Sequence, residues 1–404
     1  MHSHLAGKRR FVLALGLLTG LAAVTIDMSL PAIPAMVADL GTTMSLGQQI
    51  VGWFMAGIAL GQLPAGLVSD RIGRLPVLYA GIGLFTLAGA VCAASQSIEV
   101  MLAARLLQGF GASVGIVVTR AIVRDISSGK DAARLLTIMV MVFTAAPMLA
   151  PIVGSFLMTV SGWRMPFIAI AVFGALMMYS VNLGLQETRA PMRDHHILRQ
   201  LVMSFGEFFR HRRSILGMLL VMLTAAGFMA MITGSSALII DIYGYPVAYF
   251  GFIFAVAAIG LLIGSTINRR LLQRYSSQQV MAVGGALIGV AALQMLYVAW
   301  LGAAPFWWLW GNVALYLAGT GMVLPNATAL VLDPVPSISG VAASIIGTAQ
   351  NAAAALSSII SSLLYDGTIR NVVLTMGVCG IGVVVTLIAG NRILATPGAA
   401  QESP

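Results

Sequence analysis

The stretch Phe11–Pro34, FVLALGLLTGLAAVTIDMSLPAIP, decides which class of fold the chain can adopt. About 20 consecutive apolar residues match the hydrocarbon thickness of a bilayer, so the stretch predicts a membrane-spanning helix. Its only charge is Asp27. A carboxylate at this depth costs roughly 2.5–3.5 kcal/mol on insertion scales, which indicates a side chain that binds or carries something. The alternative is that Asp27 lies near the outer interface and caps the helix end.

The composition extends this prediction to the whole chain. Of the 404 residues, 59% are hydrophobic and 9% are charged, whereas about a quarter are charged in soluble proteins. The chain also lacks the alternating segments of about ten residues that build a transmembrane barrel. We therefore expect an all-α polytopic membrane protein with about twelve transmembrane helices. The predicted spans are residues 11–33, 48–69, 76–95, 100–122, 135–158, 164–186, 215–239, 247–268, 279–301, 306–330, 341–364 and 371–392.

The only long polar stretch, residues 187–214, divides six spans from six. Apolar residues recur there at helical spacing among basic ones, as in a helix that lies on a membrane surface. The two halves could rock about a central cavity, although their sequence similarity is too weak to show a repeat. The predicted domains are a cytoplasmic amino terminus (1–10), an N-terminal six-helix bundle (11–186), a cytoplasmic linker with an amphipathic helix (187–214), a C-terminal six-helix bundle (215–392) and a cytoplasmic tail (393–404).

The distribution of basic residues predicts the orientation. If the amino terminus is cytoplasmic, the cytoplasmic segments hold every lysine and arginine except Arg105, Arg164 and Arg370. This bias predicts that both termini are cytoplasmic and that the chain is a multi-pass protein of a bacterial inner membrane. It also accounts for the net charge of +9, so we expect lipid and not nucleic acid as a partner.

The two cysteines, Cys92 and Cys379, fall in apolar runs of distant predicted helices. This argues against a disulfide or a metal site, and no metal ion or cofactor is expected. Residues 8–10 are basic and precede an apolar run, as in a signal peptide. The run, however, continues through Asp27 and two prolines without a small-residue cleavage site, so we interpret it as a retained first helix.

Residues 66–74, GLVSDRIGR, resemble the signature of the major facilitator superfamily between helices 2 and 3. Gly73 permits a tight turn, and the arginines beside it could pair with acids such as Asp125. By the resemblance, Asp70 meets the amino-terminal end of helix 11 near Gly340 and latches the inner gate shut in the outward-facing state. The alternative is a simple positive-inside turn. The resemblance assigns gating roles to Gly66, Asp70, Arg71, Gly73 and Arg74.

Residues 105–111, RLLQGFG, are similar to the second motif of the superfamily, in which an arginine projects into the cavity. A fixed cation in hydrocarbon must face a partner or water. The first predicted helix runs outward and the fourth runs inward, so Asp27 and Arg105 would both lie in the outer half of the bilayer and could sense each other. The alternative is that Arg105 snorkels to the outer interface.

Residues 146–155, APMLAPIVGS, are similar to a motif of exporters in this superfamily. Small residues allow close helix packing and prolines leave a bend that can serve as a hinge. The stretch departs from the motif, with alanines for the leading glycines and Ser155 for the final one. We expect gating roles for Pro147, Pro151 and Gly154.

The most particular resemblance is carried by residues 27–34 (DMSLPAIP), 119–125 (TRAIVRD) and 340–344 (GVAAS). Together they look like the bicyclomycin- and chloramphenicol-resistance (Bcr/CflA) branch of drug:proton antiporters, over essentially the whole chain. The resemblance adds Arg124 and Asp125 to the gating residues. Three positions depart from the branch: Ser29 replaces a frequent tyrosine, Leu75 replaces a second arginine, and Thr19 stands where some relatives have another acid.

The resemblance implies proton-coupled multidrug efflux by alternating access, in which a monomer exports amphipathic small molecules in exchange for protons. Asp27 would carry the proton, and Arg105 would affect its loading. One alternative cargo is an endogenous metabolite such as an amino acid or a sugar, for which the cavity should show more hydrogen-bonding groups. A membrane enzyme or sensor has no support, because the chain holds no phosphate-binding Gly-Lys-Ser loop and no His-Glu-x-x-His.

Candidate cavity residues are methionines, aromatic residues and amides, which adapt to varied ligands. At helical spacing such side chains also face lipid or neighbouring helices. The candidates are Met28, Trp53, Phe54, Met55, Gln62, Gln108, Met222, Phe228, Met229, Met231, Asn312 and Gln350.

Overall fold

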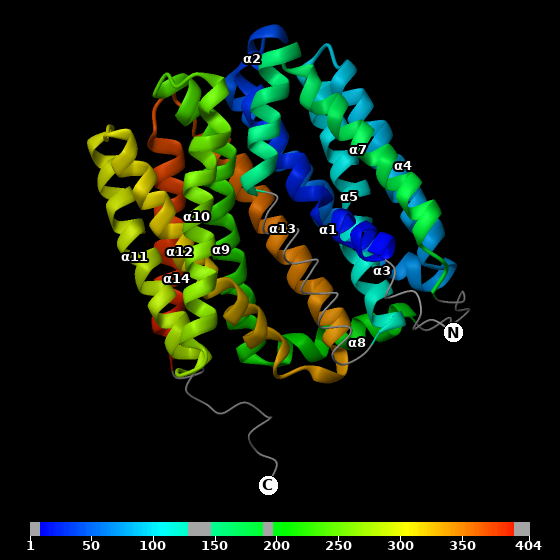
Figure 1. Ribbon diagram of the computed structural model, residues 1–404. Coiled ribbons are helices and arrows are strands. Elements are labelled where there is room, and N and C mark those ends of the chain that lie inside the picture. The colour runs from blue at the N-terminus through cyan, green and yellow to red at the C-terminus, as the bar shows by residue number, and fades with distance from the viewer. Residues whose placement is uncertain (1–8, 128–146, 189–196, 392–404) are drawn as a thin grey trace. The chain divides into compact units, whose positions relative to one another are not determined.

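The structure is a computed structural model that describes residues 9–127, 147–188 and 197–391 (Figure 1). Within these ranges every regular element is a helix. The elements are α1 (Arg9–Ser29), the 3-10 turn η1 (Leu30–Ala32), α2 (Ile33–Asp39), α3 (Met44–Ile72), α4 (Arg74–Ala94), α5 (Ile98–Ile126), the Pro147–Ser161 helix, α7 (Arg164–Gly184), α8 (Ile197–Arg210), α9 (Arg212–Ser236), the π-helical turn η2 (Ala237–Ile242), α10 (Val247–Leu271), α11 (Ser277–Leu301), α12 (Phe306–Leu332), the 3-10 turn η3 (Pro336–Ile338), α13 (Ser339–Leu363) and α14 (Arg370–Ala389).

Eleven helices in the described ranges are long and apolar enough to cross a membrane, and Pro147–Ser161 is a shorter apolar helix. Each predicted span coincides with one of these twelve helices. The first part of predicted span 135–158 lies outside the described residues, as do 1–8 and the predicted tail 393–404. The prediction of an all-α polytopic membrane fold is confirmed.

The first predicted span is broken just beyond Asp27. α1 ends at Ser29, the 3-10 turn η1 follows, and α2 begins at Ile33. Pro31 and Pro34 explain the break, because proline lacks the N–H that an uninterrupted helix would use and its ring crowds the preceding turn. The carboxyl-terminal end of the span is held at Asp39, whose Oδ2 accepts hydrogen bonds from Trp163 Nε1 at 3.0 Å and from Arg164 Nη1 at 2.8 Å.

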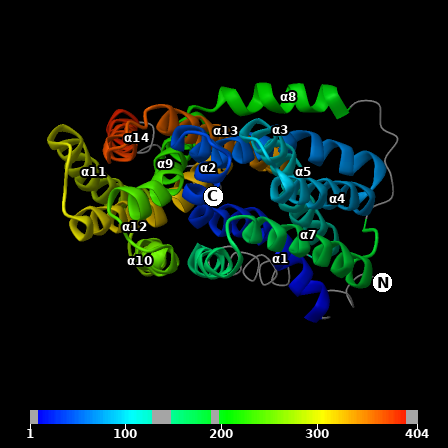
Figure 2. The ribbon, with the colours of Figure 1, turned by 90° about the horizontal axis from the view of Figure 1, so that it is seen from above.

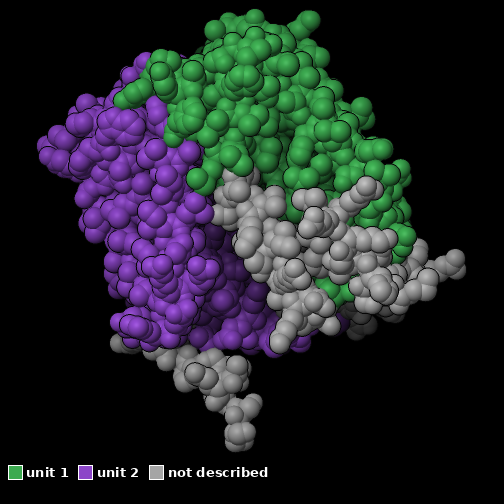
Figure 3. All heavy atoms as spheres, viewed as in Figure 1, with its two compact units in different colours: residues 1–195, 245–252 green, residues 196–244, 253–404 purple. Residues whose placement is uncertain are grey.

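The chain forms two compact units (Figure 3). Unit 1 contains residues 1–195 and 245–252, and unit 2 contains residues 196–244 and 253–404. Within unit 2, α8 lies crosswise to the spans: Figure 2 shows α8 from the side, whereas α9 and α14 of the same unit are seen more nearly end-on. Phe208 of α8 is fully buried, while Met203 and Phe209 are exposed.

The two units repeat the same helix contacts. At each of these contacts a glycine brings one backbone against its neighbour, so that an added methyl group would overlap the residue it faces. In unit 1 the pairs are Gly57 with Leu106, Gly81 with Val114, and Gly111 with Phe85; in unit 2 they are Gly260 with Ala314, Gly284 with Met322, and Gly319 with Ile288. The positions in α3 and α4 have counterparts 203 residues later in α10 and α11 (57 to 260, 81 to 284). The positions in α5 have counterparts 208 residues later in α12 (106 to 314, 114 to 322). The repeat that similarity alone could not show is therefore present in the packing.

Candidate functional site

Asp27 lies at the centre of a 26-residue apolar span, Ala14–Asp39, and only 2% of its surface is exposed. Within the described residues it takes part in no hydrogen bond and no ion pair. The hydroxyls on either side of it are bonded to their own helix: Thr25 Oγ1 donates to the Leu21 carbonyl at 2.6 Å and Ser29 Oγ to the Ile26 carbonyl at 2.8 Å. The alternative that Asp27 caps a helix end at the interface is wrong. Asp27 is a buried acid in the middle of an apolar span, and it has no partner among the residues that the structure describes.

The backbone beside Asp27 is packed against the Pro147–Ser161 helix. A methyl group on Gly154 would overlap the Met28 carbonyl oxygen and lie 2.9 Å from the Met28 carbonyl carbon. Only glycine permits this approach without a shift of one helix. α5 approaches α1 from another side, where a methyl group on Gly115 would lie 3.0 Å from the Leu18 carbonyl oxygen. The position of Asp27 is therefore set by close backbone contacts.

Two other members of the exporter-like stretch also pack closely within unit 1. Pro151 is buried, and its carbonyl carbon would lie 2.7 Å from a methyl group on Gly251. Ser155 Oγ accepts a hydrogen bond from the Gly251 N–H at 3.1 Å. Pro147 is half-buried at the start of the helix.

Arg105 is fully buried on α5. Its Nε donates to the Ile50 carbonyl at 3.2 Å and its Nη1 to Gln108 Oε1 at 2.8 Å, while Nη2 lies 3.5 Å from Ser29 Oγ. The guanidinium carbon also lies 4.5 Å from the centroid of the Phe54 ring, a cation–π contact. The alternative that Arg105 snorkels to the interface is wrong, because no part of the side chain reaches the surface.

No ion pair joins Arg105 to Asp27 among the described residues. The guanidinium reaches α1 two residues further on, at Ser29, and the groups that it contacts are all uncharged. The two side chains that were predicted to sense each other are thus not joined directly, and each is buried without an oppositely charged partner among the described residues. Such an arrangement is costly, which is typical of functional sites.

The candidate cavity residues of the first half lie around this buried site. Trp53 is half-buried and the other candidates are buried. Three of these candidates each have a buried polar atom without a hydrogen-bond partner in the described part of the chain: Trp53 Nε1, Gln62 Oε1 and Gln108 Nε2. Phe54 packs on Arg105, and Gln108 bonds to it, so their contacts are with the arginine. The buried candidates are Met28, Phe54, Met55, Gln62 and Gln108.

In unit 2 the candidates lie on α9, α12 and α13. Met229 and Met231 are buried, whereas Met222 and Phe228 are half-buried. Asn312 is buried, and its Nδ2 donates to the Trp308 carbonyl at 2.9 Å. Gln350, on α13, is half-exposed.

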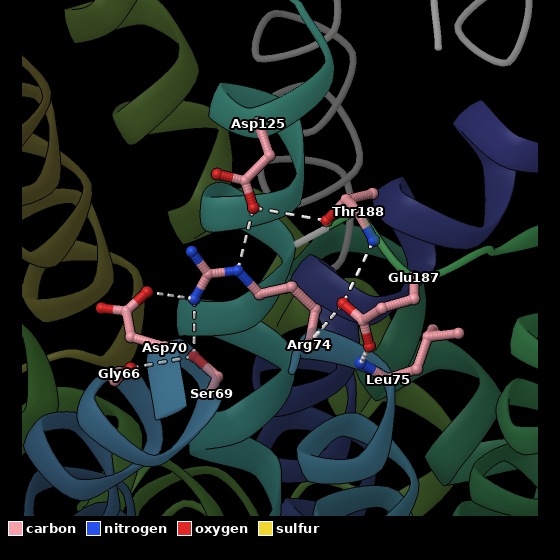
Figure 4. Close-up of polar contacts among 8 residues, drawn as sticks. All are labelled: Gly66, Ser69, Asp70, Arg74, Leu75, Asp125, Glu187 and Thr188. Atoms are coloured by element: carbon pink, nitrogen blue, oxygen red, sulfur yellow. Dashed lines mark hydrogen bonds and ion pairs between the residues drawn. The ribbon is translucent and has the colours of Figure 1, made fainter. Parts of the chain in front are cut away.

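A second polar group, the turn cluster (Ser69, Asp70, Arg74, Asp125, Glu187 and Thr188), lies at the turn between α3 and α4 (Figure 4). Arg74 is buried at its centre: Nη1 lies 2.7 Å from Asp70 Oδ1 and Nε lies 2.9 Å from Asp125 Oδ2. The predicted pairing of Arg74 with Asp125 is confirmed. The predicted tight turn at Gly73 is also confirmed, since its φ of +103° is a conformation that favours glycine. Arg71 and Arg124 are exposed, and Gly66 is half-buried.

Glu187 completes the turn cluster, and the sequence analysis did not identify it. Its Oε1 accepts from the Arg74 N–H and its Oε2 from the Leu75 N–H, both at 2.9 Å (Figure 4). These are the first N–H groups of α4, which have no partner within the helix, and the carboxylate also matches the positive end of the helix dipole. Thr188 Oγ1 donates to Asp125 Oδ2 at 3.3 Å. The segment after α7 therefore joins the start of α4 to the end of α5. An acid at the first position after the predicted span 164–186 was the available signal.

Among the described residues no group of three or more histidine, cysteine, aspartate or glutamate side chains could hold a metal ion.

Residues 15–358 match the model of the protein family described as the Major Facilitator Superfamily. The chain is 28% identical over 386 residues to the "Bicyclomycin resistance protein homolog" of Haemophilus influenzae, covering 94% of each chain. It is 32% identical to the "Uncharacterized MFS-type transporter YdgK" of Bacillus subtilis, covering 84% of this chain and 86% of the relative. It is also 28% identical to "Multidrug resistance protein D" of Escherichia coli, covering 87% and 88%.

Solved structures share the fold. A D-xylose-proton symporter superposes with a TM-score of 0.75 at 15% identity, covering 94% of this chain and 96% of the symporter. An inward-facing bacterial homolog of the human lysosomal transporter Spinster superposes with a TM-score of 0.73 at 15% identity, covering 96% and 98%. At this identity the similarity shows the fold alone. The family match, however, spans most of the chain, so this protein belongs to the Major Facilitator Superfamily and is a membrane transporter rather than an enzyme.

Proposed function

We propose that the protein exports amphipathic small molecules in exchange for protons, with Asp27 as the proton carrier. The names of two relatives, a bicyclomycin resistance protein homolog and multidrug resistance protein D, support drug-like cargo. The observation that carries the proton part is the unpaired burial of Asp27 in the middle of its span. An acid is rarely retained at such a position unless it binds or moves something.

The chemistry of the exchange follows from that burial. A buried carboxyl group without a partner is penalised in its charged form. An arriving cationic group, or water that enters with the cargo, compensates the charge and lets the proton leave. Arg105 contributes a fixed positive charge nearby, held by uncharged groups so that it does not neutralise Asp27 by direct pairing. Proton and cargo then compete for the same acid.

Transport proceeds by rocking of two six-helix halves, residues 11–186 and 215–392, joined by the linker 187–214. The Pro147–Ser161 helix acts as a hinge element, and the turn cluster acts as a latch on the cytoplasmic side. In this proposal the protein is a monomer of a bacterial inner membrane with both termini in the cytoplasm, as the distribution of basic residues predicts.

The test replaces the acid and measures proton-driven efflux in proteoliposomes. Asp27→Asn keeps the size of the side chain but cannot release a proton, so we expect efflux driven by a pH gradient to be lost while the protein stays folded. Efflux by a folded Asp27→Asn protein at the wild-type rate would refute the proposal.

Asp366→Asn is the matched control. Asp366 lies on the exposed loop between α13 and α14, where hydrogen bonds from Thr368 hold the pKa of its carboxyl below the usual value. It therefore stays charged at working pH and carries no proton, and this variant should transport normally.

The alternative cargo is an endogenous metabolite such as an amino acid or a sugar. The observation that favours it is a group of side chains on α13 that can form hydrogen bonds, namely Thr348, Gln350 and Asn351.

A further inference from the structure

α13 combines polarity with exposure in a way that no other described span does. It is the least apolar of the described spans, and α14 is the most apolar, yet the same share of residues, 39%, is buried in both. A span that is mostly uncovered and faces lipid must be apolar, because hydrocarbon offers no hydrogen bonds. Some of the polarity of α13 lies in buried serines such as Ser357 and Ser358, so the residues on its uncovered surface decide whether that surface meets water or lipid.

The exposed residues of α13 differ between the two halves of the helix. In the second half of α13, Leu356, Ile360 and Leu363 are 60%, 50% and 65% exposed at helical spacing, as expected of a stripe that faces lipid. In the first half, residues 340–352, no residue is exposed to that degree. Instead, the half-exposed side chains there include Thr348, Gln350 and Asn351. The two halves of α13 thus face different surroundings.

The polar groups of the first half have unused hydrogen-bonding capacity. Gln350 makes no hydrogen bond within the described part of the chain, and Thr348 Oγ1 is buried without a partner there. Asn351 Nδ2 donates to the Gly347 carbonyl at 2.8 Å, which leaves its Oδ1 as an acceptor. Together the three side chains offer donors and acceptors on neighbouring faces of one helix.

We propose that Thr348, Gln350 and Asn351 form a subsite that binds hydroxyl and amide groups on an uncharged part of the cargo. The proposal rests on the efflux function proposed above and deepens it, because it names the chemistry that the cargo must carry. A cargo with such groups satisfies the three side chains, whereas a purely lipophilic cation leaves them unpaired when it excludes their water.

The first experiment tests whether these residues face water. In a protein whose native cysteines are replaced (Cys92→Ala, Cys379→Ala), single cysteines are introduced by Gln350→Cys and Asn351→Cys. Leu356→Cys and Ile360→Cys on the same helix are the controls. A permanently charged methanethiosulfonate added to both sides of the membrane reacts with the thiolate, which forms only in contact with water. We expect residues 350 and 351 to react at least about tenfold faster than 356 and 360, and equal rates would overturn the proposal.

The second experiment tests the cargo chemistry with two probes. Chloramphenicol is uncharged and carries hydroxyl and amide groups, whereas tetraphenylphosphonium is a lipophilic cation with neither. Chloramphenicol should slow labelling of the cysteine at residue 351, and tetraphenylphosphonium should not. If chloramphenicol gives no protection, or if the cation protects equally well, the assigned cargo chemistry is wrong.

Efflux by substituted proteins gives a second readout. Gln350→Leu and Asn351→Leu keep the side-chain volume but remove the polar atoms. Each should lower chloramphenicol efflux about five- to tenfold, the effect of one lost hydrogen bond. Efflux of tetraphenylphosphonium should stay within about twofold, and an equal loss for both probes would contradict a role in cargo selection.

The labelling experiment needs no proton gradient, so it separates this proposal from the proposed exchange. Chloramphenicol should still protect residue 351 in the Asp27→Asn protein. Loss of proton-driven efflux with protection intact would support both proposals. Transport by Asp27→Asn with protection intact would refute proton carriage by Asp27 and leave the subsite standing.

Discussion

Arg105 shows what residue patterns can and cannot predict. A single cation in an apolar helix predicts a buried functional group, and the structure places it fully inside unit 1. Its partners could not be predicted, because they include the backbone carbonyl of Ile50 and the face of Phe54, neither of which carries a sequence signature. From the sequence, the opposite charge of Asp27 made it the natural candidate to interact with Arg105. The structure shows that the guanidinium instead lies close to the hydroxyl of Ser29.

At the scale of a single residue, we predict that replacing Glu187 lowers the stability of the protein. Glu187→Gln leaves one oxygen to accept from the Arg74 and Leu75 N–H groups and removes the charge that matches the start of α4. We expect a loss of about 1 kcal/mol in unfolding free energy, the usual effect of a weakened helix cap. Chemical denaturation in detergent, with α-helical circular dichroism as the signal, measures it.

The neighbouring substitution Gln186→Ala is the control, because Gln186 is exposed. Equal stability of the Glu187→Gln and wild-type proteins would show that water satisfies these N–H groups as well as the carboxylate does.

At the scale of the element, hydropathy alone located the helices, because about 20 apolar residues in a row have one stable arrangement in a bilayer. The break of the first span after Ser29 is caused by Pro31 and Pro34. Both prolines are visible in the sequence, but the sequence does not show where the helix ends or what turn follows it. Close helix contacts were the least predictable feature. Many of the 44 glycines lie in apolar runs, and only the three-dimensional packing shows which of them touch another backbone.

For the Pro147–Ser161 helix, we predict that replacing Gly154 affects both stability and transport. Gly154→Ala adds a methyl group that overlaps the Met28 carbonyl, so the Pro147–Ser161 helix and α1 must separate beside Asp27. We expect a loss of stability of about 1–3 kcal/mol from overpacking. The pH at which transport is half-maximal should also shift, because the surroundings of the acid change. Thermal unfolding and the pH profile of efflux measure the two effects.

Gly311→Ala is the matched control, since Gly311 lies within membrane-spanning α12 and an added methyl group there meets no atom within 4 Å. If Gly154→Ala and Gly311→Ala behaved alike, close packing at Met28 would not position Asp27.

At the scale of the whole molecule, the two units share their packing but not their charges. The repeat shifts of 203 and 208 residues place Ser277 at the position of Arg74 and Val313 at the position of Arg105. Ser277 donates instead to Asn326 Oδ1 at 2.8 Å, an uncharged contact. Sequence comparison of the halves failed for this reason: the polar residues diverged, while the contacts that persist rely on small residues, which are common in apolar helices. The fold is repeated, and the proposed proton chemistry belongs to the first repeat.

This asymmetry leads to a prediction about charge movement. Asp27 is the one acidic side chain that is buried among the described residues, so the proposed exchange moves one proton per cargo molecule. Export of an uncharged cargo then carries one net charge inward, and an inside-negative potential of 100 mV contributes about 2.3 kcal/mol, enough for roughly a fifty-fold gradient. Export of a monovalent cation against one proton moves no net charge. In proteoliposomes with a potential set by valinomycin and potassium, chloramphenicol efflux should therefore increase with the potential and tetraphenylphosphonium efflux should not. A strong response of the cation would require a second proton and hence a second acid, while the Asp27→Asn protein should show no response with either probe.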